Sequence, residues 1–472
     1  MVNRKLIKDL LDESACSHNK EKKSGCDKPK PGATNGGCAF EGSQISLFPY
    51  ADAVHLVHAP ATCQGASWET RATPTSYKGE NNTPLGYCTD VTTNDVIFGG
   101  NKKLEESIEY IVAHKNPKAI FVYETCVTAM IGDDMDNICK RMQKKHNLPI
   151  VVVHAPGFVG SKNLGSRLGG EAVLEQLIGT REPESIHPYG INLIGEYNVT
   201  GDMWQYTPIL EKIGIKVVST LAGDGRIEDI QTAHRAKLNV IVCAKSLITL
   251  CRKMEEKYNI PHVSVSFYGK RDTTNAIMSI VNAFGDTALT KRAKKIIAEE
   301  EAKLDKALGP YRKFFDHKKA ILNTGGNKSW SIASALQDIG IEVVATSIRK
   351  ATLEDIEIAK EYVPILMKVP ANEQAKLIDE HNVDILLAGG RSLYTAIKKK
   401  VAFVDVNQEK KVSYGAYGGL VNLAKDVANA VHNPVFKIVG TQAPWEDEGK
   451  EKINIINTNN SKYTLWYNDA YF

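Results

Sequence analysis

The sequence predicts an α/β protein of three Rossmann-like domains with mostly parallel sheets, and three observations support this fold class. The chain has 472 residues, which suits roughly three domains of about 150 residues each. From residue 38 onward, short apolar runs alternate with helical stretches, with glycine-marked turns between them. The apolar runs are continuous and do not alternate with polar residues, which is typical of parallel strands buried on both faces.

Apolar runs of this kind are predicted to be strands, and eight of them serve as examples. They are residues 119–123, 150–153, 191–194, 216–219, 240–243, 320–323, 341–344 and 384–388. In sheets of this kind, ligands bind beyond the carboxyl ends of the strands. Cys126, the segment Gly223-Asp224-Gly225 and the pairs Gly325-Gly326 and Gly389-Gly390 all fall at such ends.

The composition divides the chain into an N-terminal arm, three α/β domains and a C-terminal tail. The arm is polar and rich in helix breakers, and a long charged helical stretch joins the second domain to the third. The expected boundaries are 1–37 for the arm, 38–187, 188–317 and 318–435 for the domains, and 436–472 for the tail.

The bulk composition is that of a soluble globular protein. Hydrophobic residues make up 43% of the chain and charged residues 24%, and the net charge is +4. Because the charges are mixed and nearly balanced, nucleic-acid and membrane binding are not expected. No apolar run is long enough to span a bilayer, and the first residues do not form a signal-peptide core, so we expect a cytoplasmic location.

Three of the nine cysteines lie in turns marked by glycine or proline. They are Cys38, Cys63 and Cys126, which only tertiary folding could bring together. An odd number of cysteines at low density does not suggest a disulfide framework. Three thiolates are one short of the four that usually hold an iron–sulfur cluster. If they converge, the fourth ligand comes from elsewhere in the chain, from a partner or from solvent, which suggests a cluster shared at a subunit interface.

Three later cysteines have different surroundings. Cys139 and Cys251 lie in helical patterns and are expected to be packed thiols. Cys243 ends an apolar run that is predicted to be a strand, so its thiol is expected in the ligand crevice.

The N-terminal arm holds Cys16, His18 and Cys26, which could bind zinc or simply belong to a surface segment. The role of Cys88 is left open, with a packed thiol as one interpretation.

Residues 157–170 form a glycine-rich segment that follows a predicted strand. Its glycines would let the backbone approach a ligand closely, or would make it a flexible loop with a solvated basic face. Lys162 and Arg167 lie in it, and Arg71 follows Cys63 closely enough to line the same cavity. Cationic side chains suit an anionic iron–sulfur cluster and a carboxylate-rich ligand. No P-loop spacing, HExxH or CxxC pattern occurs.

Several segments together resemble the α-type subunits of the nitrogenase superfamily, and the resemblance covers nearly all of residues 1–445. Within that superfamily it is strongest to subunits that assemble the iron–molybdenum cofactor. The matching segments are 37–42, 55–63, 126–134, 157–165, 192–198, 324–330 and 388–391.

The resemblance implies roles for individual residues. In the family, positions matching Cys38, Cys63 and Cys126 bind a cluster at the interface with a β-type subunit. That cluster is the P-cluster in the catalytic protein and a [4Fe–4S] cluster in the scaffold. Cys243 matches the cysteine that holds one end of the cofactor. Arg71 and Lys162 match residues that line the cofactor cavity.

Two departures from the catalytic pattern favour a scaffold. Asn407 stands where the catalytic subunit has a histidine that anchors the cofactor, and an amide is a poor ligand to iron compared with imidazole. Ser166 stands where a histidine assists proton delivery, and serine does not titrate near neutral pH. A site that must release its cofactor should hold it weakly at one end.

The resemblance therefore implies a cofactor-assembly scaffold without turnover of its own, paired with a β-type subunit in an α2β2 heterotetramer. A donor protein would supply the iron–sulfur precursor, the nitrogenase iron protein would drive insertion of molybdenum and homocitrate, and apo-nitrogenase would receive the product. The alternatives are a catalytic nitrogenase α subunit that reduces dinitrogen and an α/β protein whose cysteines are structural.

Overall fold

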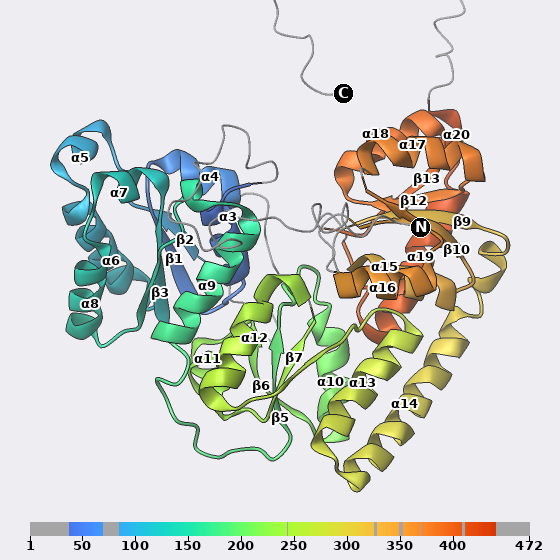
Figure 1. Cartoon of the computed structure of the whole chain (residues 1–472), viewed down its shortest axis with the longest axis horizontal. Coiled ribbons are helices and arrows are strands. Elements are labelled where there is room, and N and C mark those ends of the chain that lie inside the picture. Colours follow the sequence, from blue (N-terminus) through green and yellow to red (C-terminus); the bar gives the residue numbers. More distant parts are fainter. Residues whose placement is uncertain are drawn as a thin grey trace, which may run out of the picture.

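The computed structural model describes residues 37–68, 85–242, 244–324, 328–348, 353–368, 370–407 and 411–439. These residues form three α/β lobes that follow one another along the chain, coloured blue to cyan, green, and orange to red in Figure 1. Each lobe contains one sheet in which every pair of neighbouring strands is parallel. The predicted fold class is confirmed. No helix within these ranges is both long and apolar enough to cross a membrane.

The first lobe has a four-stranded sheet in the order β2-β1-β3-β4. Its strands are β1 (Ala53–His58), β2 (Leu85–Cys88), β3 (Ala119–Glu124) and β4 (Ile150–Val153). Its helices are α3 (Ala39–Leu47), α4 (Ala61–Trp68), α5 (Thr93–Phe98), α6 (Asn101–Lys115), α7 (Cys126–Ile131), α8 (Met135–His146), η1 (Gly157–Val159) and α9 (Lys162–Gln176).

Both faces of this sheet are covered. Helices α6 and α8 pack on one face through one apolar cluster, and α3 and α9 pack on the other through a second cluster. All four residues of β4 are therefore buried, which explains its unbroken Ile-Val-Val-Val sequence. The helices begin and end at recognisable signals. For example, the Asp134 side chain caps α8, and the helix stops at Asn147 in the left-handed conformation.

The second lobe has strand order β6-β5-β7-β8. Its elements are β5 (Gly190–Ile194), α10 (Met203–Ile213), β6 (Lys216–Leu221), α11 (Ile227–Thr232), η2 (Ala233–Arg235), β7 (Leu238–Ile241), α12 (Ala244–Tyr258), β8 (His262–Ser264) and α13 (Lys270–Phe284). The long helix α14 (Thr287–Leu308) and the short turn η3 (Arg312–Phe314) lead to the third lobe.

The third lobe has a five-stranded sheet in the order β11-β10-β9-β12-β13. Its strands are β9 (Lys319–Asn323), β10 (Glu342–Ser347), β11 (Ile365–Met367), β12 (Ile385–Ala388) and β13 (Ala402–Asp405). Its helices are α15 (Lys328–Asp338), α16 (Leu353–Tyr362), α17 (Pro370–His381), η4 (Gly390–Ser392), α18 (Leu393–Lys399), α19 (Ala416–His432) and α20 (Val435–Ile438).

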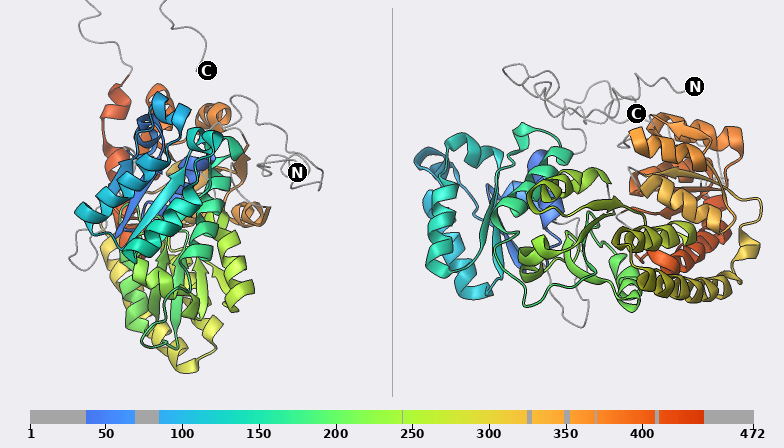
Figure 2. Two further views of the ribbon diagram at one scale, coloured as in Figure 1. Left: turned by 90° about the vertical axis from the view of Figure 1, so that its left-hand side faces the viewer. Right: turned by 60° about the horizontal axis from the view of Figure 1, so that its bottom comes forward.

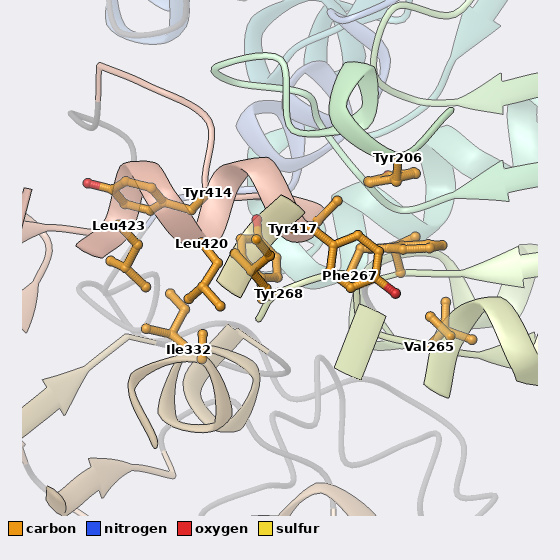
Figure 3. Close-up of a cluster of buried hydrophobic side chains, with 14 of the residues drawn as sticks. Tyr206, Val265, Phe267, Tyr268, Ile332, Tyr414, Tyr417, Leu420 and Leu423 are labelled. Carbon is orange, nitrogen blue, oxygen red and sulfur yellow. The ribbon is translucent and has the colours of Figure 1, made fainter. Parts of the chain in front are cut away.

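Apolar clusters cross the boundaries between the lobes. One cluster joins α3 and β3 of the first lobe to α11 and α12 of the second. A larger cluster joins the second and third lobes, and Figure 3 shows part of it around Phe267 and Tyr417. Within it the rings of Tyr206 and Phe267 stack with centroids 3.9 Å apart. The right-hand view of Figure 2 shows the same succession of lobes, whereas in the left-hand view the first lobe lies in front of the third.

Candidate metal centre

The three turn cysteines of the first lobe each lie at the start of a helix. Cys38 is the N-cap of α3, Cys63 is in the first turn of α4, and Cys126 is the first residue of α7. The amino end of a helix carries a partial positive charge, which favours thiolates and other anions. The helix amino ends therefore favour negatively charged sulfur at these positions, although burial opposes this at Cys63, where the pKa of the thiol is raised.

The sulfur atoms of Cys38 and Cys126 face the same point in space. A Cβ atom built on Gly157 would lie 3.0 Å from the Cys126 Sγ and 3.1 Å from the Cys38 Sγ. No side chain fits at residue 157 without displacing these sulfurs. Glycine at this position therefore leaves room beside the two thiols, at the start of η1.

Cys63 belongs to the same group. Burial raises the pKa of its thiol, and Cys126, Cys38 and Cys88 raise it further. The three turn cysteines are each half-buried. In the described part of the chain, no three ligating side chains lie close enough to hold a single metal ion. A polynuclear iron–sulfur cluster binds cysteines that are farther apart than the ligands of one ion, so this donor set fits such a cluster.

Close packing of α3 on α9 fixes the position of Cys38. A Cβ on Gly165 would lie 1.8 Å from the Ala39 carbonyl oxygen, and a Cβ on Gly42 would lie 1.9 Å from the Lys162 carbonyl oxygen. The Ser166 hydroxyl donates a hydrogen bond of 3.0 Å to the Gly42 carbonyl. The structure therefore corrects one expectation. Most of the glycine-rich segment forms α9, and its glycines serve contact between helices.

The turn that carries Cys126 is bound to the end of β1. The hydroxyls of Thr125 and Thr128 each donate a 3.0 Å hydrogen bond to the His58 carbonyl. Thr125 and Thr128 also form a capping box at the start of α7. These contacts, together with the buried His58 side chain, were not anticipated from the sequence. The only available signal was the position of His58 shortly before Cys63.

The other predicted site residues are placed as follows. Lys162 begins α9, and its Nζ lies 2.5 Å from Glu41 Oε1, beside the Cys38 turn. Asn407 follows β13 and is exposed. Its side chain lies beside Gly389, which follows β12, since a Cβ built on Gly389 would be 3.1 Å from the Asn407 Nδ2. Arg71 and Cys243 lie outside the described residues.

The remaining cysteines are distinct from the three in the turns. Cys139 and Cys251 are buried, with exposed fractions of 1% and 0%, and burial raises the pKa of each thiol to about 12. Their predicted role as packed thiols is confirmed. Cys88 is half-buried at the end of β2, and its thiol donates to the Ala59 carbonyl at 3.2 Å. Cys16, His18 and Cys26 lie outside the described residues.

Large apolar side chains are exposed on the elements that carry or adjoin these cysteines. Phe158 and Val159 of η1 and Met130 of α7 are among them. Val96, Ile97 and Phe98 of α5 are also exposed, and α5 packs against α7. Contiguous exposed apolar residues are typical of surfaces that bind other proteins, and Val96, Ile97 and Phe98 follow one another in the chain.

Most of the chain resembles solved nitrogenase structures. Residues 38–432 match the family model described as "Nitrogenase component 1 type Oxidoreductase". The solved structure "Nitrogenase Cp1 at pH 5" superposes with a TM-score of 0.78 at 25% identity, over 93% of this chain and all of that one. This match defines the class as nitrogenase component 1.

Relatives with higher identity define the branch. The nitrogenase iron-molybdenum cofactor biosynthesis protein NifE of Rippkaea orientalis is 46% identical over 96% of this chain and 98% of its own length. The NifE proteins of Nostoc sp. and Klebsiella pneumoniae are 48% and 42% identical, over 94% and 92% of this chain and 94% and 98% of their own lengths. The chain belongs to the nitrogenase component 1 type oxidoreductase family and, within it, to the NifE branch.

Proposed function

We propose that this chain is the α-type subunit of a scaffold on which the iron–molybdenum cofactor of nitrogenase is completed. Its β-type partner would be NifN, in an α2β2 heterotetramer. The observation that carries the proposal is the convergence of the Cys38 and Cys126 sulfurs beside Gly157, with Cys63 in the same group, in a chain of the NifE branch.

The three thiols would hold a [4Fe–4S] cluster whose fourth ligand comes from the partner. Two features support this assignment. The thiols are half-buried, so one side of the group is open to another molecule, and the exposed apolar residues Phe158 and Val159 adjoin it. A cluster bound there would supply electron transfer. The protein's own part is to place the thiolates at helix amino ends and to shield them on the side of Gly157.

The precursor of the cofactor would bind beyond the carboxyl end of β7 in the second lobe. In the sequence, Cys243 comes two residues after Ile241, the last residue of β7. Parallel sheets bind ligands beyond the carboxyl ends of their strands. Cys243 would anchor the iron–sulfur precursor, while Arg71 and Lys162 would face its anionic groups and the homocitrate. Asn407 is exposed and follows the carboxyl end of β13. It would face the end of the precursor opposite Cys243 and would bind that end only weakly.

The surroundings of Ser166 favour a protein that holds the cofactor during its assembly over one that uses the cofactor in catalysis. Its hydroxyl donates to the Gly42 carbonyl, so it acts in helix packing and is not placed as a proton donor. A catalytic α subunit would need a titratable group to deliver protons. We therefore assign the chain a role in cofactor assembly, in which precursor arrives from a donor protein and finished cofactor leaves for apo-nitrogenase.

The nitrogenase iron protein would dock near Cys126, because it must reduce the scaffold during insertion of molybdenum. The apolar residues of α5, which packs against the helix that begins at Cys126, offer a surface at this point. We assign the α5 surface to the iron protein and the η1 surface to the β-type subunit.

The test is a comparison of two cysteine variants of the tetramer, purified without oxygen. Cys243→Ala should lower precursor loading, measured as iron and by electron paramagnetic resonance, and should leave the interface cluster in place. Cys251→Ala is the matched control, because Cys251 is a buried core thiol on α12, the helix whose first residue follows Cys243 in the sequence. Full loading of Cys243→Ala would refute its ligand role. A high rate of acetylene reduction by the unaltered tetramer would favour the catalytic alternative, and colourless, iron-free protein would favour structural cysteines.

A further inference from the structure

A buried hydrogen-bonded group lies between the segments that carry the turn cysteines. His58 ends β1, five positions before Cys63, and its side chain has an exposed fraction of 0%. Its Nε2 lies 3.0 Å from Asp133 Oδ2, and the Asp133 side chain has an exposed fraction of 2%. Its Nδ1 lies 3.0 Å from the Thr89 Oγ1. The side chain therefore joins three separate parts of the first lobe.

The orientation of the imidazole follows from its neighbours. A carboxylate can only accept, so Nε2–H donates to Asp133, and Nδ1 accepts from the Thr89 hydroxyl. The Thr89 oxygen in turn accepts from the Ala59 amide at 3.1 Å. Asp133 Oδ1 accepts from the Gly100 amide at 2.8 Å. Every polar atom of the imidazole and the carboxylate thus has a partner, although the pair is buried.

Each residue of this group lies close in sequence to a cysteine or to the helix that begins with one. Thr89 follows Cys88, and Asp133 follows α7, whose first residue is Cys126. The His58 carbonyl holds the other end of that helix through Thr125 and Thr128. A single residue therefore binds both ends of α7 to the strand that leads to Cys63.

We propose that His58, held by Asp133, is a positioning residue for the metal centre and fixes the Cys63 turn relative to the Cys126 helix. The proposal rests on the proposed function in one respect, namely that a cluster binds these thiols. Loss of a residue that orients metal ligands commonly costs 10-fold to 100-fold in metal affinity. The His58 side chain is buried, and its hydrogen bonds go to Asp133 and Thr89, so its role is one of holding these segments together.

Two substitutions of His58 separate its two hydrogen bonds. An asparagine amide reaches about as far as Nδ1, so His58→Asn keeps the bond to Thr89 and loses the bond to Asp133. A glutamine amide reaches about as far as Nε2, so His58→Gln keeps the bond to Asp133. The proposal requires His58→Gln to behave like the unaltered protein and His58→Asn to fail.

A third substitution acts on the pair without changing either residue. A Cβ on Gly100 would lie 2.6 Å from Asp133 Oδ2 and 3.0 Å from His58 Cε1, so Gly100→Ala displaces the pair. Gly309→Ala is the control, because the nearest atom to its Cβ would be 3.4 Å away, at the end of α14.

The first readout is the rate at which a ferrous chelator removes iron from the anaerobically purified tetramer. We expect release that is on the order of tenfold faster for His58→Asn and Gly100→Ala, and within about twofold of the unaltered protein for His58→Gln and Gly309→Ala. Equal rates for His58→Asn and the unaltered protein would overturn the proposal. So would a rate for His58→Gln as fast as that for His58→Asn.

The second readout uses the metal-free chain, so that it does not depend on the proposed function. Alkylation of Cys63 and Cys126 by a maleimide, followed by mass spectrometry, reports how firmly the two turns are held. We expect faster alkylation in His58→Asn and an unchanged rate in His58→Gln, with Cys139 protected in both. Unchanged alkylation in His58→Asn would count against the proposal. An unaltered tetramer that holds no iron would instead refute the proposed function, and the alkylation rates would still decide the role of His58.

Discussion

Gly165 lies so close to Ala39 that a Cβ on Gly165 would be 1.8 Å from the Ala39 carbonyl oxygen. Ala39 follows Cys38, the N-cap of α3, and Gly165 is in the first turns of α9. The glycine therefore sets the distance between the two helices and, through α3, the position of one thiol of the metal centre.

The substitution Gly165→Ala tests this contact. Because the clashing atom belongs to the backbone, it cannot turn aside, and the helices must separate. Overpacking of this kind costs about 1–3 kcal/mol, so we expect a loss near the upper end of that range in the free energy of unfolding, measured with urea. Gly309→Ala, whose Cβ would meet its nearest atom at 3.4 Å in ordinary van der Waals contact, should change the free energy by less than about 0.5 kcal/mol. Equal stability of the two variants would contradict the assigned role of Gly165.

Removal of one turn cysteine should remove the interface cluster. We expect Cys38→Ala to lose the electron paramagnetic resonance signal and the iron of that cluster, because two thiolates and one partner ligand cannot hold it. Cys139→Ala is the matched control, since Cys139 is buried in the apolar cluster on the opposite face of the same sheet. It should keep its iron and lose only stability. Unchanged iron in Cys38→Ala would show that Cys38 is not a ligand.

A charge on the α5 surface should block the iron protein. Phe98 has an exposed fraction of 85% and lies beside Ile97, at 67%. Phe98→Asp should weaken binding of the iron protein by about 2 kcal/mol, roughly thirtyfold, if it lies at the centre of that interface. Tyr394→Asp serves as the control, because Tyr394 has an exposed fraction of 74% on α18 of the third lobe. An equal effect of both variants on the dissociation constant would remove α5 as the docking surface.

A buried carboxyl group should make stability depend on pH. Burial raises the pKa of Asp272 from 3.8 to about 6, although the Ser334 hydroxyl donates to it at 2.9 Å. The folded protein therefore keeps this proton at a pH where the unfolded chain has lost it. As the pH rises from 3.8 to about 6, the group should reduce stability by on the order of 2 kcal/mol, and its effect should level off within about one pH unit above that.

The comparison that checks this expectation is urea unfolding of the metal-free protein and of Asp272→Asn at pH 4, 5, 6 and 7. The difference between the two proteins should change mostly between pH 4 and pH 6 and only slightly between pH 6 and pH 7. A difference that is the same at all four pH values would contradict the raised pKa.

The sequence predicts much of the fold because local pattern and burial agree in most strands. Residues 150–153 are continuous in β-branched side chains and form β4. Strand β1 is not among the eight apolar runs, because His55 and His58 interrupt its apolar residues. Both imidazoles are buried, and partners that are distant in sequence make this possible, such as the Tyr123 hydroxyl at 2.7 Å from His55 Nδ1. A pattern of apolar residues cannot show that a polar side chain will find such a partner.

The metal centre was also predictable only in part. The turns around Cys38, Cys63 and Cys126 were visible in the sequence, because glycine and proline indicate a turn without any knowledge of distant residues. The functions of Gly157 and Gly165 depend on which segments meet in the folded chain, so the sequence left a ligand contact and a flexible loop as the alternatives. The His58–Asp133 pair joins residues that are far apart in sequence, and no local pattern indicates it.

The most direct test of the central claim is a maturation assay. The chain, co-expressed with its β-type partner and purified without oxygen, is mixed with apo-nitrogenase, iron protein, ATP, reductant, molybdate and homocitrate. The account predicts nitrogenase activity that depends on the tetramer and is lost with Cys243→Ala. No restoration, together with strong substrate reduction by the tetramer alone, would contradict it and would identify the chain as part of a catalyst.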